Sequence, residues 1–340
     1  MVIYGLMRIG LLVCGVLLTA APVLAQSLAV ERLPRERLDV VPPSARVSGA
    51  PGRMTVLETA CPAVPTTQLR RRIVDLAVQE WAFFGFPVVD QMAPPAPSRR
   101  PGGARGPRRG FRWLDADESA RVAASIAGYW TVTPEASWII DDQNEAWNGS
   151  DGVGVRWRNP WSAAFVSWVM CEAGLGERSR FAHAVAHHVY IDQAIRARAG
   201  TETGAAYVAR DVGEAALEPG DLLCSARRPG YRTLAERVRQ MGEGARTHCD
   251  IVVKVDAPAG QVLAIGGNVR GVVSLKRLPM GPGAPTRGAF AHLELRAPGA
   301  GADLLDDSAT IQALGCALDP DAGLRRTLAR VVPGAARDRC

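Results

Sequence analysis

The feature that most constrains the fold of this 340-residue chain is a change in the spacing of its apolar residues at about residue 220. Before that point, helical spacing predicts an amphipathic helix from Gln68 to Phe84 and a second helix from Glu118 to Trp130. After it come short β-rich runs at Asp221 to Ser225, His248 to Val255, Gln261 to Gly267, Val272 to Leu278 and Phe290 to Arg296. Helices followed by strands predict an α+β fold with N-terminal helices packed on an antiparallel, meandering β-sheet.

The first 25 residues have the pattern of a secretory signal peptide. Arg8 precedes an apolar run from Ile9 to Leu18, and small residues and the Val23-Leu24-Ala25 tripeptide follow. The run is too short to span a bilayer comfortably, and Gln26 replaces the cysteine that a lipoprotein signal would need. We therefore expect cleavage after Ala25 and an exported protein, periplasmic or secreted, with no membrane span after cleavage.

The remaining chain is interpreted as one domain with three less regular segments. Residues 26–65 are rich in Pro, Arg and Ser and are expected to form an extended lead-in that packs little, and residues 66–298 form the domain. The domain contains a loop at 92–110, and a C-terminal tail follows at 299–340. The loop is strongly basic through Arg99, Arg100, Arg105, Arg108 and Arg109. We interpret it as a solvated insertion, since no interleaved aromatic residues or nucleic-acid motif accompany it, and expect no nucleic-acid partner.

Signal cleavage would remove Cys14 and leave an even number of cysteines, namely Cys61, Cys171, Cys224, Cys249, Cys316 and Cys340. An even count in an exported chain predicts disulfides, although the sequence alone does not choose the pairing. A Cys316–Cys340 bond would pin the tail, and a Cys224–Cys249 bond would cross-link two neighbouring predicted strands. An arrangement with some free thiols stays open.

The segment RNPWSAAFVSWVM at residues 158–170 predicts a buried helix that begins near Pro160. Ser162 lies in its first turn, where unpaired backbone N–H groups and the positive end of the helix dipole stabilise an alkoxide or an oxyanion. A serine there can also serve only to cap or pack the helix start. Three further motifs favour a chemical role: PGDLL at 219–223, THCDIVV at 247–253 and IGGNV at 265–269.

In this order the motifs resemble the papain-like cell-wall hydrolases of the CHAP type and their NlpC relatives. They resemble still more the bacterial family named domain of unknown function 2272, and the resemblance spans about Gln68 to Arg296. It implies a papain-like fold in which a helix-start nucleophile attacks a carbonyl, a strand histidine takes the proton, and a polar residue on the next strand orients the imidazole. By motif position these roles fall on Ser162, His248 and Asn268.

Other residues are candidates for orienting the imidazole or for lining the cleft. Asp250 is the rival orienter, because it shares the face of His248 two residues further along the strand. Trp161, Asp221 and His187 are candidates for the wall of the cleft. No cofactor is expected.

The chain departs from the hydrolase pattern by carrying serine where the CHAP and NlpC hydrolases use cysteine. Cys171 and Cys249 do not substitute, since each is expected on the opposite face of its element from the site. Serine needs a well-aligned base, because its hydroxyl does not ionise near neutral pH as a thiol does. Two functions therefore stay open: a hydrolase that cleaves amide bonds in peptidoglycan peptides, with Ser162 as nucleophile and His248 as base, or an inactive papain-like domain that binds peptidoglycan or another cell-envelope ligand.

The sequence also contains one candidate metal site. His183 and His187 are four residues apart in a segment expected to be helical, and two imidazoles on one helix face can hold zinc. The acidic residue of HExxH is missing, because Ala184 follows His183. We therefore expect no bound metal.

Overall fold

The computed structural model describes residues 29–92, 114–281, 284–285 and 288–315. The predicted signal peptide, most of the arginine-rich loop, Cys316 and Cys340 lie outside these ranges. Within the described residues, no helix combines the length and the apolar character needed to cross a membrane.

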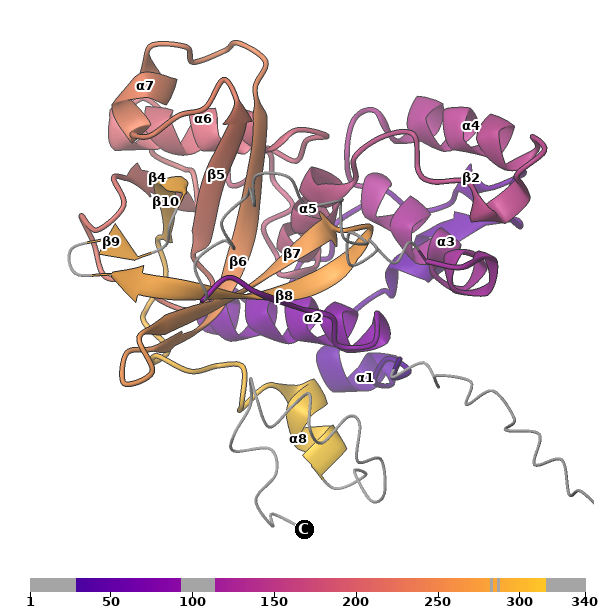
Figure 1. The fold of residues 1–340 in the computed structure, drawn as a ribbon, viewed down its shortest axis with the longest axis horizontal. Helices are drawn as coiled ribbons and strands as arrows, with labels where there is room; N and C mark the ends of the chain where they lie inside the picture. The colour runs from indigo at the N-terminus through magenta and orange to yellow at the C-terminus, as the bar shows by residue number, and fades with distance from the viewer. Residues whose placement is uncertain (1–28, 93–113, 282–283, 286–287, 316–340) are drawn as a thin grey trace, which may run out of the picture.

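The chain forms a mixed α+β structure (Figure 1). The helices are α1 Arg35–Leu38, α2 Leu69–Phe83, α3 Ala116–Trp130, α4 Ala136–Trp147, α5 Ser162–Glu172, α6 His187–Arg198, α7 Leu234–Val238 and α8 Ala309–Gly315, with 3-10 turns η1 Pro43–Arg46, η2 Thr66–Gln68 and η3 Gly152–Gly154. The strands are β1 Val47–Ser48, β2 Thr55–Val56, β3 Val88–Asp90, β4 Tyr207–Arg210, β5 Leu222–Arg228, β6 Arg246–Asp256, β7 Gln261–Val269, β8 Val272–Gly281, β9 Ala284–Pro285 and β10 Ala289–Leu295.

The main sheet has the strand order β3-β8-β7-β6-β5-β10-β4, and β9 pairs with β8 beside this path. All its pairs are antiparallel except β3 with β8. The predicted meander is therefore confirmed from β5 to β8. It is wrong for β10, which returns to pair with β5 and β4, because the pattern of a strand does not reveal its neighbour.

Helices α2, α5 and α6 pack against the sheet and enclose the main core with one of its faces. Strand alternation divides β6 between the two faces. Cys249, Ile251 and Val253 belong to the main core, whereas Val252 belongs to a smaller apolar cluster on the other face. Figure 1 shows α3, α4 and β2 together on the right of the sheet, and α6 and α7 together at the upper left.

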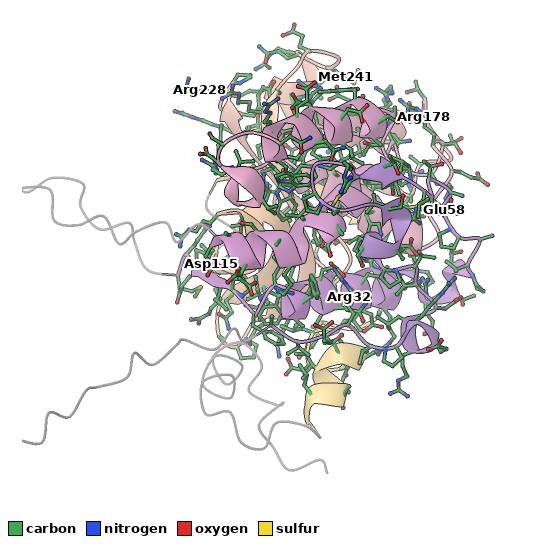
Figure 2. The ribbon with its side chains drawn as sticks, turned by 90° about the vertical axis from the view of Figure 1, so that its right-hand side faces the viewer. Arg32, Glu58, Asp115, Arg178, Arg228 and Met241 are labelled. Atoms are coloured by element: carbon green, nitrogen blue, oxygen red, sulfur yellow. A yellow bond between two sulfur atoms is a disulfide. The ribbon has the colours of Figure 1, made fainter. Side chains whose placement is uncertain are left out.

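The lead-in segment packs more closely than its composition predicts. Arg46 is fully buried, and its guanidinium pairs with the buried Glu172 at the end of α5. Val40 is 1% exposed, and Cys61 forms a disulfide with Cys171. In Figure 2 the labelled Arg32 and Glu58 lie on this segment, against the body of the molecule. The expectation of little packing is wrong, because two ion pairs, Arg32–Glu80 and Arg46–Glu172, and one disulfide anchor a segment that has no helical or strand periodicity.

A second disulfide joins Cys224 on β5 to Cys249 on β6, as the strand prediction suggested. Downstream of β10, residues assigned to the tail also enter the core. Leu305 and Ile311 are at most 1% exposed, and α8 lies against α2.

Candidate active site

Ser162 is the first residue of α5, as predicted. Trp161, which precedes it, is 2% exposed and stacks on Phe84 and Tyr129, with ring centroids 5.9 and 5.8 Å apart. The tryptophan therefore fixes the start of the helix in the core. Ser162 itself stays partly exposed, beside the unpaired N–H groups of the first helical turn.

The hydroxyl of Ser162 contacts His187, the first residue of α6, rather than His248. His187 Nε2 lies 2.7 Å from Ser162 Oγ. The other ring nitrogen, Nδ1, receives the backbone N–H of Cys249 at 3.2 Å and also contacts the Tyr190 hydroxyl. The sequence predicted His187 in the wall of the cleft or in a histidine pair for zinc, and not in contact with Ser162. Tyr190, three residues further along the same helix, could have been recognised from this spacing.

These contacts assign the tautomer of His187. A backbone N–H can only donate, so Nδ1 must accept from Cys249. The Tyr190 hydroxyl agrees with this, because burial raises its pKa well above the ordinary value and keeps it a protonated donor. Burial, followed by the charge of His248, lowers the pKa of His187 well below its ordinary value, so the ring is neutral. Its single proton is then on Nε2, and His187 donates a hydrogen bond to Ser162.

His187 occupies a gap in the sheet. The pairing of β6 with β7 contains a one-residue shift near Val253, and the last pair at the end of β7 that approaches the site is Ile251 with Ile265. Beyond this point the imidazole, instead of β7, takes the N–H of Cys249. The shape of the site is therefore set by the place where two neighbouring strands separate.

His248 lies beside His187, with ring centroids 5.1 Å apart. Its Nε2 is 2.9 Å from Asp250 Oδ1, and the second carboxylate oxygen of Asp250 is 2.7 Å from Lys276 Nζ. Burial opposes ionisation of Asp250, but the charges of Lys276 and His248 outweigh it and hold the pKa of this carboxyl well below its usual range. Because Asp250 Oδ1 accepts from His248 Nε2, the neutral form of His248 carries its proton on Nε2 and has an acceptor at Nδ1.

Two glycines of the IGGNV motif make room for this arrangement. A Cβ on Gly266 would lie 2.0 Å from Asp250 Oδ1 and 2.9 Å from His248 Nε2. A Cβ on Gly267 would lie 2.5 Å from the Cβ of Phe165 on α5. Any side chain at either position would displace the histidine–aspartate pair or the helix that carries Ser162.

Asn268 takes a different position from the predicted one. The hydrogen bond from the His248 ring goes to Asp250, the rival orienter. Asn268 has a left-handed backbone, with φ of 54°, and lines a cavity together with Trp161. Asparagine tolerates this conformation better than most residues do. The role of orienting His248 therefore suits Asp250, and Asn268 suits the wall of the cleft.

Asp221 belongs to the protein interior. Its carboxylate pairs with Arg70 at 2.8 Å and contacts His292 Nε2 at 2.8 Å, and it also accepts the N–H of Leu295. These contacts join α2 to β10 and give Asp221 a structural role. Its sequence motif alone does not distinguish a buried carboxylate that holds strands from one that faces a cleft.

His183 does not share a helix face with His187, because α6 begins only at His187. The ring nitrogens of His183 contact the carbonyls of Leu175 and Ser167 at 2.9 and 3.1 Å. The helical histidine pair that we weighed as a zinc site is thus not formed. In the described ranges, no group of three or more His, Cys, Asp or Glu residues could hold a metal ion.

Fold and site together define an α+β protein in which a serine at a helix start contacts one histidine, and a second histidine beside the first is paired with a charged aspartate. The chain belongs to the family described as an uncharacterized protein conserved in bacteria, DUF2272, whose model matches residues 116–290, just over half of the chain. Comparison with curated proteins and with solved structures gave no match.

Proposed function

We propose that this protein is an exported cell-envelope hydrolase with a papain-like site, in which Ser162 attacks the carbonyl carbon of an amide or ester. The observation that carries the proposal is the hydrogen bond between Ser162 Oγ and the neutral His187, next to the His248–Asp250–Lys276 chain. Helix α5 packs on β6 and β7, which is the arrangement that the resemblance to papain-like hydrolases implies. Peptidoglycan peptides are the substrate class that this resemblance suggests.

The two histidines take different roles in the proposed reaction. His187 cannot accept the proton of Ser162, because its Nε2 already carries one and its Nδ1 faces donors. Its N–H instead stabilises negative charge on Oγ, as does the start of α5. His248 has an acceptor at Nδ1 and a charged aspartate at Nε2, and it is the base.

The steps then follow the pattern of acyl transfer. Ser162 Oγ forms a bond to the carbonyl carbon while its hydroxyl proton moves to His248 Nδ1. His248 returns that proton to the leaving nitrogen or oxygen as its bond to carbon breaks. In the second half, water attacks the acyl carbon while one of its protons moves to His248 Nδ1. His248 then returns that proton to Ser162 Oγ as the bond between Oγ and the acyl carbon breaks.

Export is part of the proposal. Both disulfides of the described residues, Cys61–Cys171 and Cys224–Cys249, are typical of an oxidising compartment, and they agree with the signal-like N-terminus.

The test is hydrolysis of peptidoglycan sacculi and of small amides and esters by the mature protein. We expect Ser162→Ala and His248→Ala each to lower the rate by at least about 10³-fold. Ser150→Ala, at an exposed position, serves as the matched control and should leave the rate unchanged. Full activity in Ser162→Ala would contradict the proposal.

One observation favours a second function, a catalytically inactive domain that binds peptidoglycan or another cell-envelope ligand. The hydrogen bond recorded for Ser162 Oγ leads to His187, which donates rather than accepts. In that case the parent protein binds sacculi without cleaving them, and Ser162→Cys creates amidase activity by supplying a thiolate. In a working serine hydrolase, Ser162→Cys only changes a rate that the parent already shows.

A further inference from the structure

A cavity of about 190 Å³ opens next to the start of α5. Its walls include three tryptophans, Trp147, Trp157 and Trp161, and the aliphatic side chains of Val122 and Ile126. The rings of Trp147 and Trp157 meet edge to face at 5.2 Å and form one wall. Rigid aromatic rings of this kind give the cavity a preformed apolar wall.

The cavity is lined by residues that lie next to the candidate active site in the sequence. Trp161 directly precedes Ser162, and Asn268 directly follows the two glycines that accommodate the His248–Asp250 pair and α5. A substrate whose carbonyl reaches Ser162 would therefore have a neighbouring group within reach of the cavity.

The size and charge of the cavity limit what it can hold. An apolar cavity of about 150 Å³ accommodates benzene, so this space suits one aromatic ring or a branched aliphatic group of similar size. Two arginines, Arg156 and Arg158, also line it, and the guanidinium of Arg158 is paired with Asp142 at 2.6 Å. The tryptophan and aliphatic walls therefore favour an apolar group, and the arginines disfavour a cationic one.

We propose that this cavity is the specificity pocket of the enzyme and that it binds an aromatic or branched apolar group on the acyl side of the bond that is cleaved. The inference rests on the proposed hydrolase site, and it favours amides and esters whose acyl part carries such a group over the peptidoglycan peptides that the resemblance suggests. Val153, on η3, lines the cavity and is only partly buried, at the edge of a small apolar cluster, so a larger side chain there would extend into the cavity.

The first experiment uses Ser162→Ala protein, so that binding is measured without catalysis. The probe is phenylacetamide, followed by tryptophan fluorescence, with acetamide for comparison. We expect saturable binding of phenylacetamide that weakens at least about 10-fold when Val153→Phe is added. Val238→Phe, the same change at an exposed position on α7, should leave binding unchanged. Equal binding in the Val153→Phe and Val238→Phe proteins, or no saturable binding, would overturn the inference.

The second experiment uses the otherwise unmodified chain and compares p-nitrophenyl phenylacetate with p-nitrophenyl acetate, which share a leaving group. We expect kcat/KM to favour the phenylacetyl ester by at least about 10-fold, and Val153→Phe to remove that preference while hydrolysis of the acetyl ester persists. Hydrolysis without this preference would sustain the proposed function and refute the pocket. Binding of phenylacetamide without any hydrolysis would sustain the pocket as a ligand site and refute the proposed function.

Discussion

Replacement of Asp250 by asparagine separates a catalytic role of this residue from a structural one. An asparagine amide can donate to His248 Nε2, which would move the histidine proton to Nδ1 and remove the lone pair that accepts from Ser162. Loss of the aspartate from a Ser-His-Asp triad lowers kcat by about 10⁴-fold, and we expect an effect of that order for Asp250→Asn.

The same substitution also affects stability, because it leaves the Lys276 ammonium without its partner. The Lys276 side chain is 11% exposed and the Asp250 side chain 7% exposed. A broken buried ion pair costs about 3–5 kcal/mol, and the residual exposure of Lys276 places this pair at about 3 kcal/mol. The double variant Asp250→Asn/Lys276→Met removes the unpaired charge and should recover most of that loss.

The assay measures kcat/KM and denaturant unfolding for the parent, the single variant and the double variant. We expect stability to return in the double variant while activity stays low, because asparagine still faces His248. If activity returned together with stability, Asp250 would act only through the fold, and its assignment as the orienting residue would be refuted.

Three further predictions concern the surroundings of the site. Gly266→Ala places a Cβ 2.0 Å from Asp250 Oδ1 and should lower kcat/KM at least about 100-fold, measured on folded protein. Loss of the Cys61–Cys171 bond, which closes a sequence separation of 110, should lower the free energy of unfolding by up to about 5 kcal/mol, measured with guanidinium chloride for Cys61→Ala/Cys171→Ala. The pKa of His187 is lowered in the folded protein, so its contribution to stability is complete above about pH 6.5 and is lost as the pH falls. The free energy of unfolding then falls by at most about 1.4 kcal/mol per pH unit. His187→Gln should flatten this slope between about pH 7 and 5, and an unchanged slope would contradict the assignment.

Periodicity in the sequence predicted the elements that carry the site, because local patterns determine which side chains a helix or strand can bury. The predicted helix at 68–84 corresponds to α2, Leu69–Phe83, and the predicted strand at 248–255 lies within β6, Arg246–Asp256. What periodicity does not contain is the identity of neighbours distant in sequence. The pairing of β10 with β5 and the burial of Arg46 against Glu172 depend on such neighbours.

The site shows the same division between local and distant information. Ser162 and Asp250 could be proposed from motif position, since each lies at a defined place on its own element. The contact of His187 with Ser162 joins two helices and also requires β6 and β7 to separate after the Ile251–Ile265 pair. No local sequence pattern predicts that β6 and β7 separate there, although the glycines that follow Ile265 are compatible with the separation.

The central claim is that Ser162 is a nucleophile activated by His248. Its most direct measurement is covalent labelling with a fluorophosphonate, followed by mass spectrometry of the proteolytic peptides. We predict one adduct per chain, located on Ser162, absent after unfolding, and formed at least about 100-fold more slowly in His248→Ala. A folded protein that forms no adduct, or forms it on another residue, would contradict the account.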